Sequence, residues 1–407
     1  MLSWTLDYQR FVTARWRGLM CARLEHPPVL PMPEHDAWTR KLTEIASAPL
    51  EFCPDFPAIA KRYEAWWHQE IIDRPLFMAS RIIDRSRPFS KHFDLLLEDA
   101  DRWFAETRAD MRNIRAIGDY LPNVRVDFGP VFMGEMFGAR TEFGSGTTWT
   151  HAFIDDDWLV PSGAEGSGAP DWTIDEDSRF WKQFVKLSGM VAADAAGRYL
   201  VRTPDYGGSG DVLLNLRGPE KLCIDVIERP DVVSEAANGI YPSWHRAVTE
   251  SYRRVLSHGA GIIHWIGLWS NAPYVIPACD FNYLIGPEQF NRVFLPDIAR
   301  RAATVGRAVF HLDGTGATKH IDALLEIPEI RAIQYVTGAG TPSALPWIDM
   351  FRKIQTKGRS LVITCLAHEV MPLLDELKPE GLCFVPARGS GDPAIEDVFE
   401  ALCKRFS

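Results

Sequence analysis

The chain lacks the charge, the long apolar runs and the cysteine spacing that define several protein classes. Acidic residues outnumber basic ones by 54 to 44, so there is no basic footprint for nucleic acid. No apolar run approaches the ~20 residues that span a bilayer, and the N-terminus has no signal-peptide pattern. The seven cysteines are scattered and form no CxxC pair. We therefore expect a cytoplasmic protein with reduced thiols that binds neither nucleic acid nor membranes.

The chain is instead rich in short apolar runs. Hydrophobic residues make up 46% of its 407 positions, enough for a large core. Eight apolar runs alternate with helical patterns, and such alternation predicts an α/β fold, here a (β/α)8 TIM barrel. The runs are Pro75–Ile83, Val124–Phe128, Tyr199–Thr203, Gly261–Gly267, Ala308–Leu312, Ala332–Val336, Leu361–Leu366 and Leu382–Val385.

The first 72 residues contain no such strand pattern and look helical. We expect residues 1–72 to form an N-terminal helical extension and residues 73–407 to form the barrel. The extension should pack as helices on the barrel or across a homodimer interface, because it has no glycine-rich phosphate loop and no paired strand pattern.

The fifth run ends in His311-Leu312-Asp313-Gly314, the most informative stretch of the sequence. His311 and Asp313 should point to the same face, because side chains alternate along a strand. A polar pair followed by a glycine turn and a helix start is typical of the end of an α/β barrel where chemistry takes place. A paired histidine and carboxylate can act in general acid–base catalysis.

Other runs also end in polar or aromatic residues, although structural needs favour apolar side chains there. We expect four of these residues to be catalytic, namely Asp127, His311, Asp313 and Gln334. Six more are expected to bind a small-molecule substrate in an aromatic-lined pocket, namely Asp205, Arg217, Trp265, Trp269, His320 and Tyr335. For Arg217 the alternative is an ion pair with Asp205 or Asp211.

Two interpretations of the His-x-Asp pair stay open. In the first, His311 and Asp313 bind Zn²⁺ with Cys365 as the third ligand, since catalytic zinc usually has three protein ligands. In the second, which we favour, Asp313 orients His311 or caps the following helix.

Several longer motifs resemble the uroporphyrinogen decarboxylase superfamily, which contains the decarboxylase and methyltransferases that act with corrinoid cofactors. They are Val126-Asp127-Phe128-Gly129-Pro130, Gly286-Pro287-Glu288-Gln289-Phe290, His311-Leu312-Asp313-Gly314 and Ile333-Gln334-Tyr335-Val336-Thr337-Gly338-Ala339-Gly340. The resemblance covers about residues 75–400, and the His-Leu-Asp-Gly motif is similar to that of one branch. It implies a (β/α)8 barrel with its site at the top.

The departures from this pattern bear on function. The decarboxylase grips its substrate with an arginine-rich segment, of which only Arg81 is present here, and the late cysteine ligand of the methyltransferases falls at Ala387-Arg388-Gly389. Both departures point to a third activity on the same barrel, which the fold alone does not name. Among the reactions considered we favour methyl transfer or demethylation of a small methylated compound, with a corrinoid protein as partner. One alternative is a decarboxylase or lyase that uses Asp127 with Arg81 or Arg217. The other is a non-catalytic binding protein.

Overall fold

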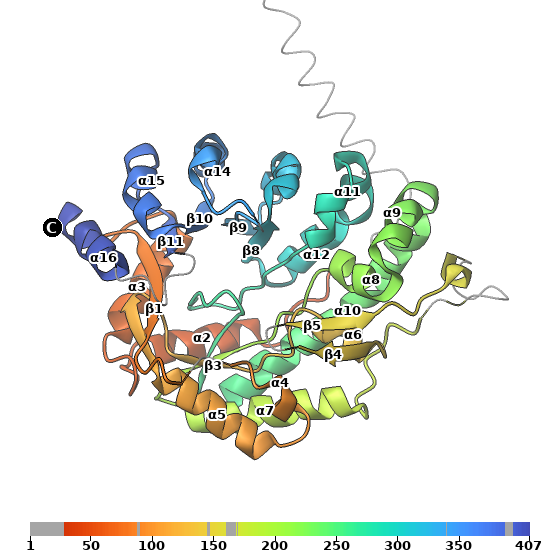
Figure 1. Cartoon of the computed structure of the whole chain (residues 1–407), viewed down its shortest axis with the longest axis horizontal. Helices are drawn as coiled ribbons and strands as arrows, with labels where there is room; N and C mark the ends of the chain where they lie inside the picture. The colour runs from red at the N-terminus through yellow and green to blue at the C-terminus, as the bar shows by residue number, and fades with distance from the viewer. Residues whose placement is uncertain are drawn as a thin grey trace, which may run out of the picture.

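Parallel strands with helices on their outer side form the framework of the molecule (Figure 1). The structure is a computed structural model that describes residues 28–87, 90–144, 147–159, 168, 170–338, 340–386 and 394–407. Its strands are β1 (Leu76–Ile82), β2 (Ile114–Gly118), β3 (Asn123–Arg125), β4 (Arg140–Phe143), β5 (Thr148–His151), β6 (Leu200–Arg202), β7 (Gly261–Ile263), β8 (Ala308–Asp313), β9 (Ile330–Val336), β10 (Ser360–Cys365) and β11 (Leu382–Pro386).

The parallel strands form two separate hydrogen-bonded sheets. One has the order β2-β1-β11-β10-β9-β8 and the other the order β3-β6-β7. The fold is thus mixed α/β with mainly parallel pairing, and the named strands of the two sheets do not join into a closed ring. At one junction β2 pairs antiparallel with β1 and occupies its edge. At the other, residues 275–278 lie beside β8 through the bridges Val275–Ala308 and Ala278–His311.

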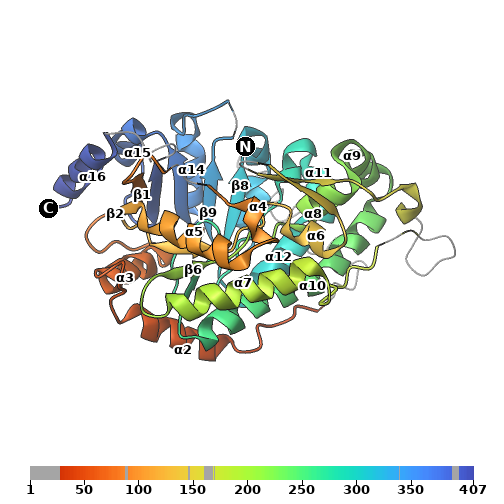
Figure 2. The same ribbon diagram turned by 60° about the horizontal axis from the view of Figure 1, so that its bottom comes forward.

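The helices differ widely in length, and α10 is the longest, with Pro242 inside it. The α-helices are α2 (His35–Ala46), α3 (Phe56–Trp67), α4 (Phe93–Leu96), α5 (Ala100–Arg112), α6 (Phe132–Met136), α7 (Arg179–Ala195), α8 (Ser209–Arg217), α9 (Pro219–Glu228), α10 (Pro230–Ser257), α11 (Pro287–Val293), α12 (Leu295–Val305), α13 (Ile321–Leu325), α14 (Ile348–Thr356), α15 (Val370–Glu376) and α16 (Ala394–Arg405). Figure 2 shows α7 running beside α10. Within the described ranges, no helix combines the length and the apolar run needed to cross a bilayer.

The described part of the N-terminal region packs on the starts of the parallel strands. The Trp66 indole of α3 donates to the carbonyl of Leu361 at 3.2 Å, and the Ser360 hydroxyl donates to the carbonyl of Trp66 at 2.6 Å. Both partners lie at the beginning of β10. Residues 1–27 lie outside the described residues, and the domain boundary at residue 72 stays a prediction.

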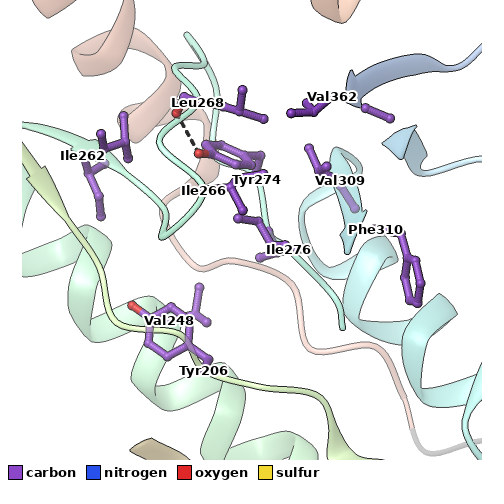
Figure 3. Packing of buried hydrophobic residues seen from close by; sticks show 14 of the residues in the cluster. Tyr206, Val248, Ile262, Ile266, Leu268, Tyr274, Ile276, Val309, Phe310 and Val362 are labelled. Atoms are coloured by element: carbon purple, nitrogen blue, oxygen red, sulfur yellow. Dashed lines mark hydrogen bonds between the residues drawn. The ribbon is translucent and has the colours of Figure 1, made fainter. Parts of the chain in front are cut away.

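The segment between β7 and β8 fills the space that the two sheets enclose. Figure 3 shows Ile266 and Tyr274 between Ile262 of β7 and the β8 residue Val309. The Tyr274 hydroxyl donates to the carbonyl of Leu268 at 2.7 Å, which folds the segment back on itself. The interior is therefore a packed core and not a channel, and polar side chains are left for the strand ends.

Candidate functional site

Strand register brings His311 and Gln334 together. His311 of β8 is the partner of Gln334 of β9 in the parallel ladder, so the two side chains lie on the same face. Both are buried, and His311 Nδ1 lies 2.7 Å from Gln334 Oε1. With this amide orientation the imidazole donates from Nδ1, which leaves Nε2 as the nitrogen that can accept a proton or bind a cation.

Two carboxylates face this histidine. Asp313 lies two residues further along β8, and Asp280 begins the 3₁₀ helix η2 (Asp280–Leu284) after the segment that bridges to β8. Asp280 Oδ1 is 3.8 Å from His311 Nε2, and one potential ligand atom from each of the three residues lies within 4.8 Å of the others. Asp313 Oδ1 is buried without a hydrogen-bond partner. A buried, unpaired carboxylate oxygen beside two more ligand atoms is a site that a cation would complete.

Burial, together with neighbouring carboxylates, sets the electrostatics of this region. Burial, together with Asp313 and Asp205, raises the pKa of Asp280 to about 7. Burial and Asp280 likewise raise the pKa of Asp211, at the start of α8, to about 8. The pKa of Asp205 is also raised, mainly by burial, while Arg125 and His311 act in the opposite direction. These raised pKa values make the region a candidate active site, since perturbed acids cluster at such sites.

Two more predicted residues border the same region. The Trp265 ring meets the His311 ring edge to face, with centroids 4.8 Å apart. Asp127 is buried and pairs with Arg125 at 3.2 Å and Lys91 at 3.6 Å. Asp127 also contributes to the field at Asp205, so the structure brings together Asp127, Asp205, Trp265, His311, Asp313 and Gln334.

Arg217 and His320 depart from the prediction because their side chains contact other elements. Arg217 is buried and pairs with Asp225 at 2.8 Å and Asp156 at 2.7 Å, and not with Asp205 or Asp211. His320 Nε2 lies 2.9 Å from the carbonyl of Asn282. Both residues hold structural elements together and do not line the site.

The predicted aromatic pocket is reduced to Trp265. Trp269 is fully buried, where its ring packs against Phe56 of α3. Tyr335 follows Gln334 on β9, so it points to the opposite face, where its ring packs against Phe351 of α14. Neither ring lies against His311, so the predicted aromatic residues do not come together in one aromatic-lined pocket.

Cys365 is not a third ligand beside His311 and Asp313. Val362 pairs with Gln334 across β10 and β9, and Cys365 is three residues further on, so it points to the other face. It is fully buried, and its pKa is raised by that burial and by Glu369. Asp280 takes the place that the sequence assigned to this cysteine. The sequence analysis missed Asp280 because Pro277 interrupts the apolar run that leads to it, and only tertiary pairing with β8 reveals its position.

These features define an α/β protein with a candidate active site at the carboxyl ends of its parallel strands. Among solved structures, the chain is similar to a methyltransferase from Methanosarcina mazei, with a TM-score of 0.52 and 12% identity. The match covers 86% of this chain and 98% of that one. At this identity the likeness concerns the fold. No protein-family model and no curated protein matches the sequence.

Proposed function

We propose that this protein is a methyl-transferring enzyme of the uroporphyrinogen decarboxylase superfamily, with a (β/α)8 barrel and His311 at the centre of its site. Two facts support the fold. Neighbouring parallel strands follow one another in the chain, except that the first, β1, pairs with the last, β11, as in a barrel. The similar solved structure is a methyltransferase. The observation that carries the site is the group Asp280, His311 and Asp313, with its unpaired buried oxygen.

The ligand atoms of this group suit a divalent cation bound through nitrogen and oxygen. One imidazole and two carboxylates fit Zn²⁺ or Mn²⁺, whereas a thiolate-bound zinc would need a cysteine here. A cation held by these three residues would polarise an oxygen or nitrogen atom of the substrate as a Lewis acid.

The residues have distinct tasks in a methyl transfer. The bond between the methyl carbon and its heteroatom breaks, and the charge left on the heteroatom must be offset. Gln334 fixes the His311 ring so that Nε2 faces Asp280, where it either holds the cation or moves a proton. Trp265 forms a flat wall beside the imidazole. Treatment with EDTA distinguishes these two tasks of Nε2, because proton transfer continues after the metal is removed and metal binding does not.

A corrinoid on a partner protein is the proposed methyl acceptor, and free cob(I)alamin can replace it in an assay. A panel of small ethers, methylamines and thioethers is incubated with cob(I)alamin, and methylcobalamin is followed by its visible spectrum. We expect formation by the native enzyme and its loss in His311→Ala, with His320→Gln as the matched histidine control. Equal rates in the native enzyme and His311→Ala would overturn the assignment.

Decarboxylation is the second proposal, and carbon dioxide release from carboxylated members of the same panel tests it. The arginines first considered for this reaction are engaged, since Arg81 pairs with Glu396 at 3.3 Å and Arg217 with Asp225. Asp127 is the feature that favours it, because a buried carboxylate can stabilise positive charge on an intermediate, although Arg125 and Lys91 offset part of its charge.

A further inference from the structure

A cavity of about 290 Å³ lies at the junction where β2 occupies the edge of β1. Its walls come from β1, the connection between β2 and β3, the end of β6, the turn after β7 and the end of β11. The lining combines apolar side chains, among them Met78, Ile266 and Val385, with a nearly equal share of polar atoms. Ile266 is drawn in Figure 3. A cavity with both apolar walls and polar groups can bind a small organic ligand.

The charged residue in the lining is Arg202, at the end of β6. Its Nε donates to the carbonyl of Trp265 at 2.8 Å, and Nη2 donates to the same oxygen. In the described part of the chain, Arg202 forms no ion pair. By contrast, Arg125, its partner in the parallel ladder, pairs with Asp127.

An unpaired guanidinium in this position is costly to the protein on its own. Burial and repulsion by Arg125 lower the pKa of Arg202 to about 10, with Asp127 offsetting only part of this effect, so the guanidinium still carries its charge at neutral pH. Partly buried charges are normally compensated by a partner. A guanidinium fork matches a carboxylate or phosphate in shape and charge, so an anionic ligand would provide that missing compensation.

We propose that Arg202 binds the carboxylate of a small organic acid whose apolar body occupies this cavity. The assignment of this acid as the substrate rests on the proposed function. Trp265 links the two places, since its carbonyl accepts from Arg202 and its ring packs on His311. The substrate class is therefore a small monocarboxylic acid, and Arg202 determines specificity for its acid group.

Arg81 of β1 provides a matched control. Residues 78–80 of β1 line the cavity, but Arg81 does not, and its guanidinium pairs with Glu396 at 3.3 Å. Arg81→Gln removes the same charge from the same protein without touching the cavity. Arg202→Gln removes the charge but keeps a donor for the Trp265 carbonyl, and Arg202→Met removes both.

Isothermal titration of the full chain with benzoate and with benzamide tests the proposal. Benzoate should bind to the native protein about tenfold to a hundredfold more tightly than benzamide, the range expected for a hydrogen-bonded charge pair. Arg202→Gln and Arg202→Met should lose that preference, and Arg81→Gln should keep it. The thermal midpoint of Arg202→Gln should not fall, because an unpaired charge has been removed. Equal binding of acid and amide, or unchanged binding by both Arg202 variants, would overturn the proposal.

Two further experiments distinguish a carboxylate ligand from a phosphate, and anion binding from the proposed reaction. Inorganic phosphate and phenyl phosphate are titrated in parallel, and tighter binding of either than of benzoate would overturn the carboxylate assignment. His311→Ala should bind benzoate as the native protein does. If Arg202-dependent binding is found while no methyl transfer or decarboxylation occurs, the anion site stands and the proposed function fails.

Discussion

Two carboxylates, Asp119 at the starts of the parallel strands and Asp313 at their carboxyl ends, differ in the partners that they have. At the starts of the strands, Asp119 is fully buried and accepts from Arg74 at 2.5 and 3.2 Å, from Arg62 at 3.1 Å and from the Phe77 amide at 3.0 Å. At the carboxyl ends, Asp313 Oδ1 is buried without a hydrogen-bond partner, and the half-exposed Asp280 beside it faces His311 and other carboxylates.

The contrast separates residues that stabilise the fold from residues available to a ligand. A buried carboxylate with a full set of donors is a structural anchor, and its removal leaves cations unpaired. A carboxylate with an unmet hydrogen-bonding requirement keeps that capacity for something outside the chain. Both kinds occur beside strand ends, so position along a strand is less informative than the partners each group has found.

The largest expected effect is on the reaction. His311→Ala should slow methyl transfer by about 10²–10⁴-fold, the contribution typical of a general acid–base group. The thermal midpoint should fall less than after truncation of a large core side chain, because the imidazole contacts mainly Gln334 and Trp265 at the edge of the core. Methylcobalamin formation and thermal unfolding are measured side by side, and an unfolded variant would place His311 among the structural residues.

The next effect is on stability and tests the opposite end. Asp119→Asn should destabilise the fold by about 3–5 kcal/mol, because Arg74 and Arg62 lose the carboxylate that neutralises them. Asp313→Asn should leave stability nearly unchanged and weaken the binding of Zn²⁺ or Mn²⁺. Urea unfolding measures the free energy of unfolding, and cation titration measures the affinity for Zn²⁺ or Mn²⁺. Equal destabilisation of the two variants would contradict the difference between Asp119 and Asp313.

A smaller effect concerns pH. Because the pKa of Asp280 is about 7, cation affinity should rise as pH increases through 7, by about tenfold per unit while one proton must leave. In EDTA, where no cation is bound, the free energy of unfolding has the opposite pH dependence. The folded state binds more protons than the unfolded one between the unfolded and folded pKa values, so the contribution of Asp280 to stability declines as pH rises through that window. Asp280→Asn should flatten both dependences.

The smallest effect concerns a residue that the sequence placed in the site. The Tyr335 hydroxyl is buried without a partner, so Tyr335→Phe should be neutral or stabilise the protein by up to about 1 kcal/mol. Methyl transfer should be unaffected. A marked loss of rate would show that Tyr335 contributes to the substrate pocket after all.

The strands were predictable because a strand of a parallel sheet is covered on both faces and therefore appears as an unbroken apolar run. Each of the eight predicted runs overlaps an observed strand. The antiparallel strands β2, β4 and β5 were missed, since strands that are partly exposed leave a weaker pattern.

For the site, side-chain alternation predicted that His311 and Asp313 would act together, and β8–β9 register adds Gln334. The same alternation excludes Tyr335 from the site, because Gln334 faces His311 and neighbouring residues of a strand cannot share a face. The partners of Arg217 and the approach of Asp280 to β8 arise from segments distant in sequence. Local sequence patterns therefore do not predict these two contacts.

The segment that fills the interior joins the two ends of the molecule through one stretch of backbone. Near its start Trp265 touches His311, and further along the carbonyl of Trp269 accepts from the Trp67 indole of α3 at 2.9 Å. Trimming the chain to a minimal enzyme that begins at β1 would remove this anchor. The shortened protein could retain every residue of the site and still lose the rigidity that holds the Trp265 wall in place.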